Sequence, residues 1–455
     1  MKSAALKEKA ERNRIKMKTD YITVIGAGFA GCEAAMQIAR AGIKCRLYEM
    51  KPVKFSPAHK SENFCELVCS NSFKAARPDS AAGLLKNEME MLGSLTVRCA
   101  KATAVPAGGA LAVNRDDFSA MVTRAVEDEP LIEVIREEME AIPREGIVII
   151  AAGPLASDAI SEDIKRLCGE NLSFYDAAAP IVSADSIDME KAFTQSRYDK
   201  GGEDDYINCP MNKEEYEAFH RELVSAESVI LHEFEKNKEI YEGCMPIEIM
   251  AKRGDNTIRF GPMKPVGLTD PRTGHRPWAV LQLRKENKAG TLYNLVGFQT
   301  NLKFGEQKRV FSMIPALHDA QFVRYGVMHR NSFLNSPRVL TSFFNLKEHP
   351  NIFFAGQITG VEGYMESAAA GIIAGINAVR RFKGEEMLLL PENTMLGALS
   401  RYVENTETKN YQPMGAAIGL LPPLSERIRD KHERYAKICD IAVNSLKEYM
   451  QSHGM

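Results

Sequence analysis

The stretch Tyr21-Ile-Thr-Val-Ile-Gly-Ala-Gly-Phe-Ala-Gly31 decides the fold of this chain. A short apolar run leads into three glycines with the spacing Gly-x-Gly-x-x-Gly, and an alanine-rich segment typical of a helix follows. Gly26 permits the tight turn, Gly28 lets the backbone approach a pyrophosphate, and Gly31 lets the helix pack closely. The free N–H groups at the helix start favour a phosphate. The sequence therefore predicts a dinucleotide site at Gly26, Ala27, Gly28, Phe29, Ala30 and Gly31.

A second apolar run, Lys44 to Tyr48, is followed directly by Glu49. Dinucleotide-binding units carry an acidic residue roughly 20 positions after the glycines, at the end of the next strand. Glu49 stands at this position. There its carboxylate can accept hydrogen bonds from both ribose hydroxyls, which favours the unphosphorylated adenosine ribose of FAD or NAD. A glycine turn without a ligand is the structural alternative, and the combination of strand, helix and acidic residue argues against it.

The composition is that of a globular protein with a large core. The chain has 455 residues, 45% of them hydrophobic, which allows two or three domains. No apolar run reaches the roughly 18 residues of a membrane span and the N-terminus is charged, so we expect a cytoplasmic protein without membrane contact. A net charge of −2 argues against non-specific nucleic-acid binding. The nine cysteines include no Cys-x-x-Cys pair, so we expect free thiols and no metal site.

The α/β pattern returns late in the chain. Asn351-Ile-Phe-Phe-Ala-Gly-Gln357 reads as a buried strand, and a helix is expected from Glu366 to about Phe382. An NAD site needs one nucleotide unit, whereas flavoproteins often complete the flavin end of their site with a late segment, so FAD is favoured. A second packing unit without a ligand remains the alternative. The late residues predicted to contact the cofactor are Gly356, Gln357, Gly363 and Tyr364.

The chain between these two parts differs from them in composition and in hydrophobic pattern. From about Ser183 charges and prolines increase, and short alternating runs indicate strands at Thr257 to Phe260, Trp278 to Leu283 and Leu292 to Phe298. Lys213 to Leu223 reads as a helix. We therefore expect an α/β fold in which both chain ends assemble a Rossmann-like FAD-binding domain, residues 17–182 and 336–455, around an inserted α+β domain, residues 183–335.

Two cysteine segments stand out by their context. Glu66-Leu-Val-Cys-Ser-Asn-Ser72 follows the nucleotide unit, and polar residues come after its thiol. Glu242-Gly-Cys-Met-Pro-Ile-Glu248 lies in the inserted part, with glycine and proline on either side of the thiol. A cysteine among apolar neighbours is more often a small core residue than a nucleophile. The pattern alone leaves both interpretations open for Cys69 and Cys244.

Taken together, these segments resemble the folate- and FAD-dependent tRNA (uracil-5-)-methyltransferases of bacteria. The resemblance keeps the same order along almost the whole chain from about Tyr21, and the glycine motif is also similar to a larger flavoprotein family that modifies wobble uridines of tRNA. Besides the cysteine segments, the resemblance rests on Gly26-Ala-Gly-Phe-Ala-Gly-Cys-Glu-Ala-Ala35, Val105-Pro-Ala-Gly-Gly-Ala-Leu-Ala-Val113, Tyr325-Gly-Val-Met-His-Arg-Asn331 and Phe354-Ala-Gly-Gln-Ile-Thr-Gly-Val-Glu-Gly-Tyr364.

The resemblance implies a reaction that uses both thiols. Cys244 adds to C6 of uracil, which makes C5 nucleophilic enough to attack the methylene of 5,10-methylenetetrahydrofolate. Cys69 then removes the C5 proton and helps shape the flavin pocket, and hydride from reduced FAD converts the methylene to methyl. The implied substrate is a T-loop uridine of tRNA, and NADH or NADPH is the implied reductant. Glu242 and Glu248 beside Cys244 would raise the pKa of its thiol.

Alternatives of other classes stay open on the sequence alone. The same chemistry on ribosomal RNA differs only in surface features that select the substrate. An NAD(P)H-dependent flavin oxidoreductase of small molecules would leave the Cys244 segment unexplained. A non-catalytic FAD- or NAD-sensing interaction protein would give a colourless or redox-silent preparation. S-adenosylmethionine methyltransferases also begin with a glycine-rich turn, but the segment from Phe354 to Tyr364 favours FAD.

Overall fold

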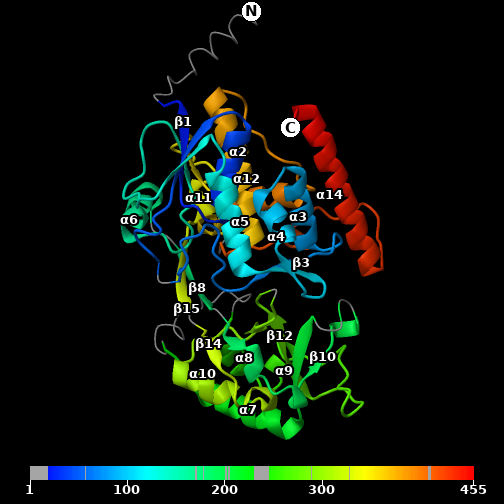
Figure 1. Cartoon of the computed structure of the whole chain (residues 1–455). Helices are drawn as coiled ribbons and strands as arrows, with labels where there is room; N and C mark the ends of the chain where they lie inside the picture. Colours follow the sequence, from blue (N-terminus) through cyan, green and yellow to red (C-terminus); the bar gives the residue numbers. More distant parts are fainter. Residues whose placement is uncertain are drawn as a thin grey trace, which may run out of the picture.

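The computed structural model describes residues 19–455 except 57, 170–171, 178, 200–201, 203–204, 230–244, 288, 327 and 408–410. The described chain forms two parts, each with its own sheet and hydrophobic core (Figure 1). The upper part in Figure 1 is built from the first and last thirds of the chain, and the lower part from the middle. A two-stranded antiparallel sheet of β8 (Leu172–Ala177) and β15 (Met328–Phe333) lies between them.

The sheet of the upper part is parallel and joins segments that are distant in sequence. Every neighbouring pair of its strands is parallel. Strands buried on both faces read as continuous apolar runs, as β1, β7 and β16 do. The prediction of a Rossmann-like fold assembled from early and late segments is confirmed. The strand order is β16 (Ile352–Phe354), β7 (Ile147–Ile150), β1 (Tyr21–Ile25), β2 (Lys44–Tyr48) and β6 (Ile132–Ile135).

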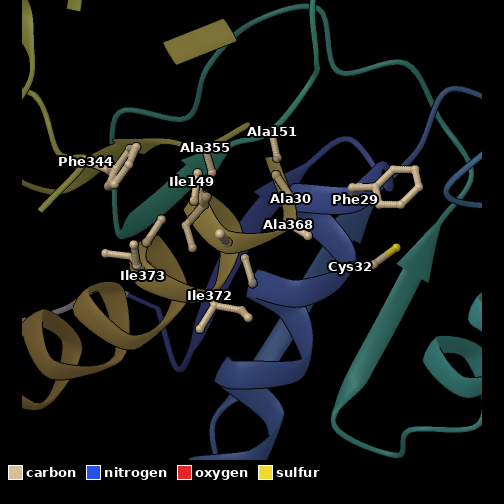
Figure 2. Packing of buried hydrophobic residues seen from close by; sticks show 14 of the residues in the cluster. Phe29, Ala30, Cys32, Ile149, Ala151, Phe344, Ala355, Ala368, Ile372 and Ile373 are labelled. Atoms are coloured by element: carbon tan, nitrogen blue, oxygen red, sulfur yellow. The ribbon is translucent and has the colours of Figure 1, made fainter. Parts of the chain in front are cut away.

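The helices α2 (Phe29–Arg40) and α12 (Tyr364–Lys383) pack against each other in this core. A Cβ atom added at Gly371 would lie only 2.1 Å from the backbone oxygen of Ala30, so the two backbones nearly touch. Figure 2 shows the small side chains Ala30 and Ala368 in this region, with Ile372 and Ile373 farther along α12. Small residues therefore hold the early and late helices at close distance.

Buried glutamates tie further elements of the upper part together. Glu33 on α2 accepts hydrogen bonds from the amides of Leu95 and Thr96. Glu88 accepts from the amides of Met395 and Leu396. Both carboxylates satisfy amides that a helix leaves free at its start. The helices involved are α3 (Ala81–Met91), which carries Glu88, α4 (Leu95–Ala102) and α13 (Met395–Glu404).

The lower part is built on an antiparallel sheet, as the alternating runs predict. Its strand order is β10 (Phe193–Thr194), β11 (Tyr206–Met211), β12 (Ala279–Lys285), β13 (Leu292–Leu295), β9 (Ile181–Ser183) and β14 (Phe322–Arg324). Its helices are α7 (Lys213–Ser225), α8 (Ile247–Ala251), α9 (Thr257–Phe260) and α10 (Phe304–Phe311).

Two predicted elements differ from the structure. Thr257–Phe260, predicted as a strand, is the helix α9, because four alternating residues fit one helical turn as well as a strand. Only Ile258 of this helix is buried. The predicted helix from Glu366 begins earlier, at Tyr364, because Gly363 adopts a φ of 125° and caps the helix start. The helix α12 therefore begins directly after the glycine turn that ends at Gly363.

The remaining elements complete the upper part. No helix within the described residues is long and apolar enough to cross a membrane. The outer helix α14 lies at the edge of the molecule (Figure 1). The remaining elements of the upper part are β3 (Ser72–Ala75), β4 (Ala104–Val105), β5 (Ala110–Val113), α5 (Arg115–Glu127), α6 (Asp158–Cys168), α11 (Ser336–Val339) and α14 (Lys431–His453).

Candidate functional site

A cavity lies where β1, β2, β7 and β16 end, because the carboxyl ends of parallel strands meet at one edge of a sheet. Most of the predicted cofactor residues line it, together with one predicted catalytic cysteine. The lining includes Gly26, Ala27, Gly28, Phe29, Ala30, Glu49, Cys65, Val68, Cys69, Gly153, Gly356, Gln357 and Tyr364.

The first glycine turn forms one wall of the cavity. Gly26 has a φ of 98°, and a Cβ there would lie 2.6 Å from the oxygen of Ala151, so only glycine fits. Gly28 caps α2, and a Cβ at Gly28 would meet no protein atom within 4 Å, so its backbone stays open to the cavity. Gly31 lies outside the lining, and a Cβ there would lie 1.8 Å from the oxygen of Gly26. Gly31 thus serves packing, as the sequence predicts.

Glu49 is held in position by the backbone. Its Oε2 accepts a hydrogen bond of 2.9 Å from the amide of Ala27, and its Oε1 accepts one of 3.0 Å from the amide of Lys51. Each carboxylate oxygen can accept a second hydrogen bond. The carboxylate therefore keeps free acceptor capacity toward the cavity, as the two hydroxyls of a ribose require.

Replacing Glu49 with alanine is expected to weaken FAD binding by roughly 100-fold or more, because two hydrogen bonds to the charged carboxylate contribute about 1.5–3 kcal/mol each. The dissociation constant can be measured from flavin fluorescence during titration of the apoprotein. Glu133→Ala is the matched control, since Glu133 lies on the adjacent strand β6 and pairs with Arg46 at the surface. Equal FAD affinity in the Glu49 and Glu133 variants would contradict the assignment.

The late segment provides another part of the cavity wall. Gly356 follows β16 with a φ of 86°, and a Cβ there would lie 3.0 Å from the Cβ of Ala30, so the two turns adjoin. The side-chain Nε2 of Gln357 donates a hydrogen bond of 2.7 Å to Oε2 of Glu362. Gly363 is outside the lining, but it caps α12 and so directs the start of this helix. The two glycine turns predicted from distant sequence segments thus face one cavity.

Cys69 contacts Tyr364 in the cavity wall. The phenol oxygen accepts a hydrogen bond of 3.0 Å from the amide of Cys69 and lies 3.2 Å from its sulfur. The Tyr364 ring stacks on Phe29 with centroids 4.8 Å apart. Burial raises the pKa of the Tyr364 phenol well above its ordinary value, so it keeps its proton at neutral pH. A neutral phenol at this distance can donate a hydrogen bond to a thiolate.

Side chains of the lower part hold the polar end of the Cys69 segment. Asn71 is fully buried and its Nδ2 donates to the oxygens of Val113 and Lys285, each at 3.0 Å. The Nε of Arg284 donates to Asn71 Oδ1 at 3.0 Å, and its Nη2 donates to Ser70 Oγ at 3.0 Å. The segment is therefore fixed by β12 of the other part of the molecule.

Two further arginines hold the apolar end of the segment. Nη2 of Arg324 donates to the oxygen of Val68 at 2.9 Å. Arg115 donates to the oxygen of Leu67 and pairs with Glu286 at 2.5 Å. The two residues on each side of Cys69 thus accept hydrogen bonds that fix the backbone from which its thiol extends.

We expect Asn71→Ala to lower the free energy of unfolding by about 2–4 kcal/mol, because it leaves buried polar partners unsatisfied. At temperatures where the variant stays folded, the substitution should also lower kcat for the methyl transfer that the resemblance implies more than it raises KM, since Cys69 loses its fixed position. Chemical denaturation and steady-state kinetics give the two values. Asn208→Ala is matched in burial and bonds Phe193, Gln195 and Gln282 within the lower sheet. A similar kcat in the two variants would show that Asn71 only stabilises the fold.

Cys244 lies outside the described residues. Its neighbour Met245 is buried, and the amide of Ile247 donates to the oxygen of Gln299 at 2.7 Å. Glu248 points into the core, where its carboxylate accepts hydrogen bonds of 2.8 Å from Thr300 and Asn301. Burial raises the pKa of Glu248. This carboxylate is therefore occupied by partners within the core.

Sequence reasoning missed the contact between Tyr364 and Cys69. It also missed the hydrogen bonds from Arg115, Arg284 and Arg324 to the Cys69 segment. No local pattern reports these contacts, because Cys69 and Tyr364 are 295 positions apart. The described cysteines are all free thiols, as predicted, and none of the described residues form a group of three or more His, Cys, Asp or Glu suited to a metal ion.

The family described as "Glucose inhibited division protein A" matches residues 21–386. The match includes both glycine turns and the Cys69 segment. A solved structure of Aquifex aeolicus GidA aligns with a TM-score of 0.68 at 16% identity, covering 94% of this chain and 73% of that one. At this identity the likeness concerns the fold.

Curated proteins match over almost the whole chain. A protein of Desulfitobacterium hafniense (strain Y51) is 57% identical over 435 residues, which cover 95% of this chain and 99% of its own length. A protein of Acetivibrio thermocellus is 56% identical over 436 residues, which cover 96% of this chain and 100% of its own. Both are named "Methylenetetrahydrofolate--tRNA-(uracil-5-)-methyltransferase TrmFO".

Proposed function

This chain belongs to the TrmFO family of methylenetetrahydrofolate--tRNA-(uracil-5-)-methyltransferases, and from that premise we propose how its residues act. The enzyme methylates C5 of a uridine in tRNA, with 5,10-methylenetetrahydrofolate as the one-carbon donor and FAD as the cofactor. We place the target uridine in the T-loop, name NADH or NADPH as the reductant, and expect the reaction in the cytoplasm. The FAD-binding domain corresponds to the predicted residues 17–182 and 336–455, except that Ile181 and Val182 belong to the sheet of the other domain, predicted as residues 183–335, which faces RNA and folate.

The residues of the cavity fit FAD. In this proposal Glu49 binds the adenosine ribose, the open backbone at Gly28 and the start of α2 bind the pyrophosphate, and Gln357 binds the ribityl chain. The start of α12 at Gly363 and Tyr364 would hold the flavin ring, because the free N–H groups of a helix start favour negative charge. When bound, FAD supplies the hydride that completes the methyl group.

Cys69 acts beside this ring. Its sulfur removes the proton from C5 of the uracil, and the Tyr364 hydroxyl at 3.2 Å stabilises the thiolate form by donating a hydrogen bond. Arg284, Arg324 and Asn71 keep the thiol at this place. Cys244 adds to C6 of the uracil and leaves again once the methyl group is complete.

One observation carries this proposal: a cysteine thiol and a buried phenol meet in the wall of a cavity formed by both glycine turns. The test is methyl transfer to a tRNA transcript by the purified protein with methylenetetrahydrofolate and NADPH, with S-adenosylmethionine as the alternative donor. Formation of 5-methyluridine is expected only with the folate. Activity with S-adenosylmethionine alone would contradict it.

Two further arms address the T-loop and the reductant. A transcript whose T-loop uridine is replaced by cytidine should give no product, and a ribosomal RNA fragment should not replace tRNA. NADPH and NADH are compared at equal concentration, and flavin bleaching under anaerobic conditions reports reduction. NADPH oxidation that depends on neither folate nor RNA would instead indicate a small-molecule oxidoreductase.

A further inference from the structure

Three aromatic rings form a near-parallel stack on the lower part. Phe322 and Tyr325 have ring centroids 5.5 Å apart at an interplanar angle of 9°, and Tyr325 and Phe304 have centroids 5.0 Å apart at 16°. At the inner end Phe322 contacts the buried Phe311. At the outer end Phe304 is 53% exposed. The stack therefore leads from the core to an open ring.

The outer ring has the geometry of an unfinished stack. One face of Phe304 lies against Tyr325, and more than half of its surface remains open to solvent. A single exposed aromatic side chain is ordinary on a protein surface. What distinguishes Phe304 is that the rings behind it are already parallel, so one more flat ring would continue the series.

The stack lies close to the segments that carry the two cysteines. Arg324, between Phe322 and Tyr325 in the chain, donates to the oxygen of Val68, beside Cys69. The amide of Val229 bonds the oxygen of Asn301, and the amide of Ile247 bonds the oxygen of Gln299. The described residues on both sides of the Cys244 segment are thus attached just before Phe304 in the chain.

Two cations and three carboxylates form ion pairs around the ring. Lys303 pairs with Glu227, and Arg309 pairs with Glu222 and Glu306, all at exposed or half-exposed positions. Exposed ion pairs contribute little to stability, so a phosphate can compete for these cations at small cost. Because the three carboxylates outnumber the two cations, we expect the ring rather than the local charge to make the main contact.

We propose that Phe304 is a stacking platform for an unpaired base of the tRNA substrate, next to the uridine that is methylated. The inference rests on the proposed function and specifies how the same site holds RNA. Aromatic side chains bind unpaired bases through their flat faces without selecting among the four bases. The three rings expose far less apolar surface than a stable protein interface buries, which favours a nucleobase over a protein partner.

The test compares Phe304→Ala with Phe304→Trp in the methyl-transfer assay. Base stacking contributes roughly 1–3 kcal/mol, so the alanine variant should raise KM for the tRNA transcript about 5- to 100-fold with a smaller change in kcat. The tryptophan variant keeps a flat ring and should retain a KM near that of the parent. Phe260→Ala is the matched control, because Phe260 is a 70% exposed phenylalanine at the end of α9.

The outcomes separate this inference from the proposed function. An unchanged KM in Phe304→Ala, or an equal rise in Phe260→Ala, would overturn the platform while the parent still makes 5-methyluridine. A parent protein that makes no 5-methyluridine would instead overturn the proposed function. A second readout is fluorescence: the tRNA transcript should quench the indole added in Phe304→Trp more than it quenches the single native Trp278. Equal quenching in both proteins would also count against the platform.

Discussion

Replacement of Cys69 with alanine is expected to abolish 5-methyluridine formation while the covalent attachment of RNA persists. General-base catalysis contributes roughly 10²–10⁴-fold, and an alanine at this position has no group that can take the C5 proton. The measurement has two parts: product analysis by nucleoside mass spectrometry, and gel detection of a protein adduct with RNA that contains 5-fluorouridine. Cys244→Ala should show the converse, with neither adduct nor product.

Cys168→Ala is the matched control for both variants, because Cys168 is also partly exposed but ends α6 and is absent from the cavity lining. It should retain both activities. A fully active Cys69→Ala protein would remove Cys69 from the mechanism. An adduct formed by Cys244→Ala would mean that another residue is the nucleophile.

Replacement of Gly371 with alanine is expected to destabilise the upper part and release FAD. In an ordinary helix this change would stabilise by up to about 1 kcal/mol, since alanine has the higher helix propensity. Here the added Cβ would lie 2.1 Å from the backbone oxygen of Ala30, and neither backbone can move without separating α2 from α12. We expect a net loss of roughly 3 kcal/mol or more.

Thermal unfolding and flavin content of the purified variant measure this loss. Gly419→Ala is the control, because a Cβ at Gly419 would meet no atom within 4 Å. A Gly371→Ala protein with parental stability and full FAD content would show that the two helices can separate without consequence for the cavity. The close contact would then have no role in bringing the two glycine turns together.

Local patterns predicted the central strands of the parallel sheet well because these strands are buried on both faces. β1, β7 and β16 are continuous apolar runs, and the glycines that follow them have few structural uses. The pattern was wrong for Thr257–Phe260, where four residues cannot distinguish a strand from a helical turn. Element type is therefore predictable where a run is long or fully buried, and weakly predictable elsewhere.

Some residues of the candidate site could likewise be predicted from local sequence, and others could not. Glu49 and the glycines could be named from their spacing, since a strand, a turn and a helix are one local unit. The roles of Cys69 and Cys244 came from resemblance, because a thiol in a polar loop fits several functions. Arg115 and Arg284 had no sequence signal. No local pattern placed Arg324 or Lys285 against the Cys69 segment either, since these contacts join positions far apart in the chain.

The sequence by itself determined that this chain holds a dinucleotide, because the backbone freedom of glycine and the spacing to Glu49 are local properties. Only the tertiary structure decided that both glycine turns face one cavity and that Tyr364 meets Cys69 there. The physical reason is that such contacts depend on how closely α2 and α12 pack. That distance is set by Gly371 against Ala30, two residues whose proximity exists only in the folded chain.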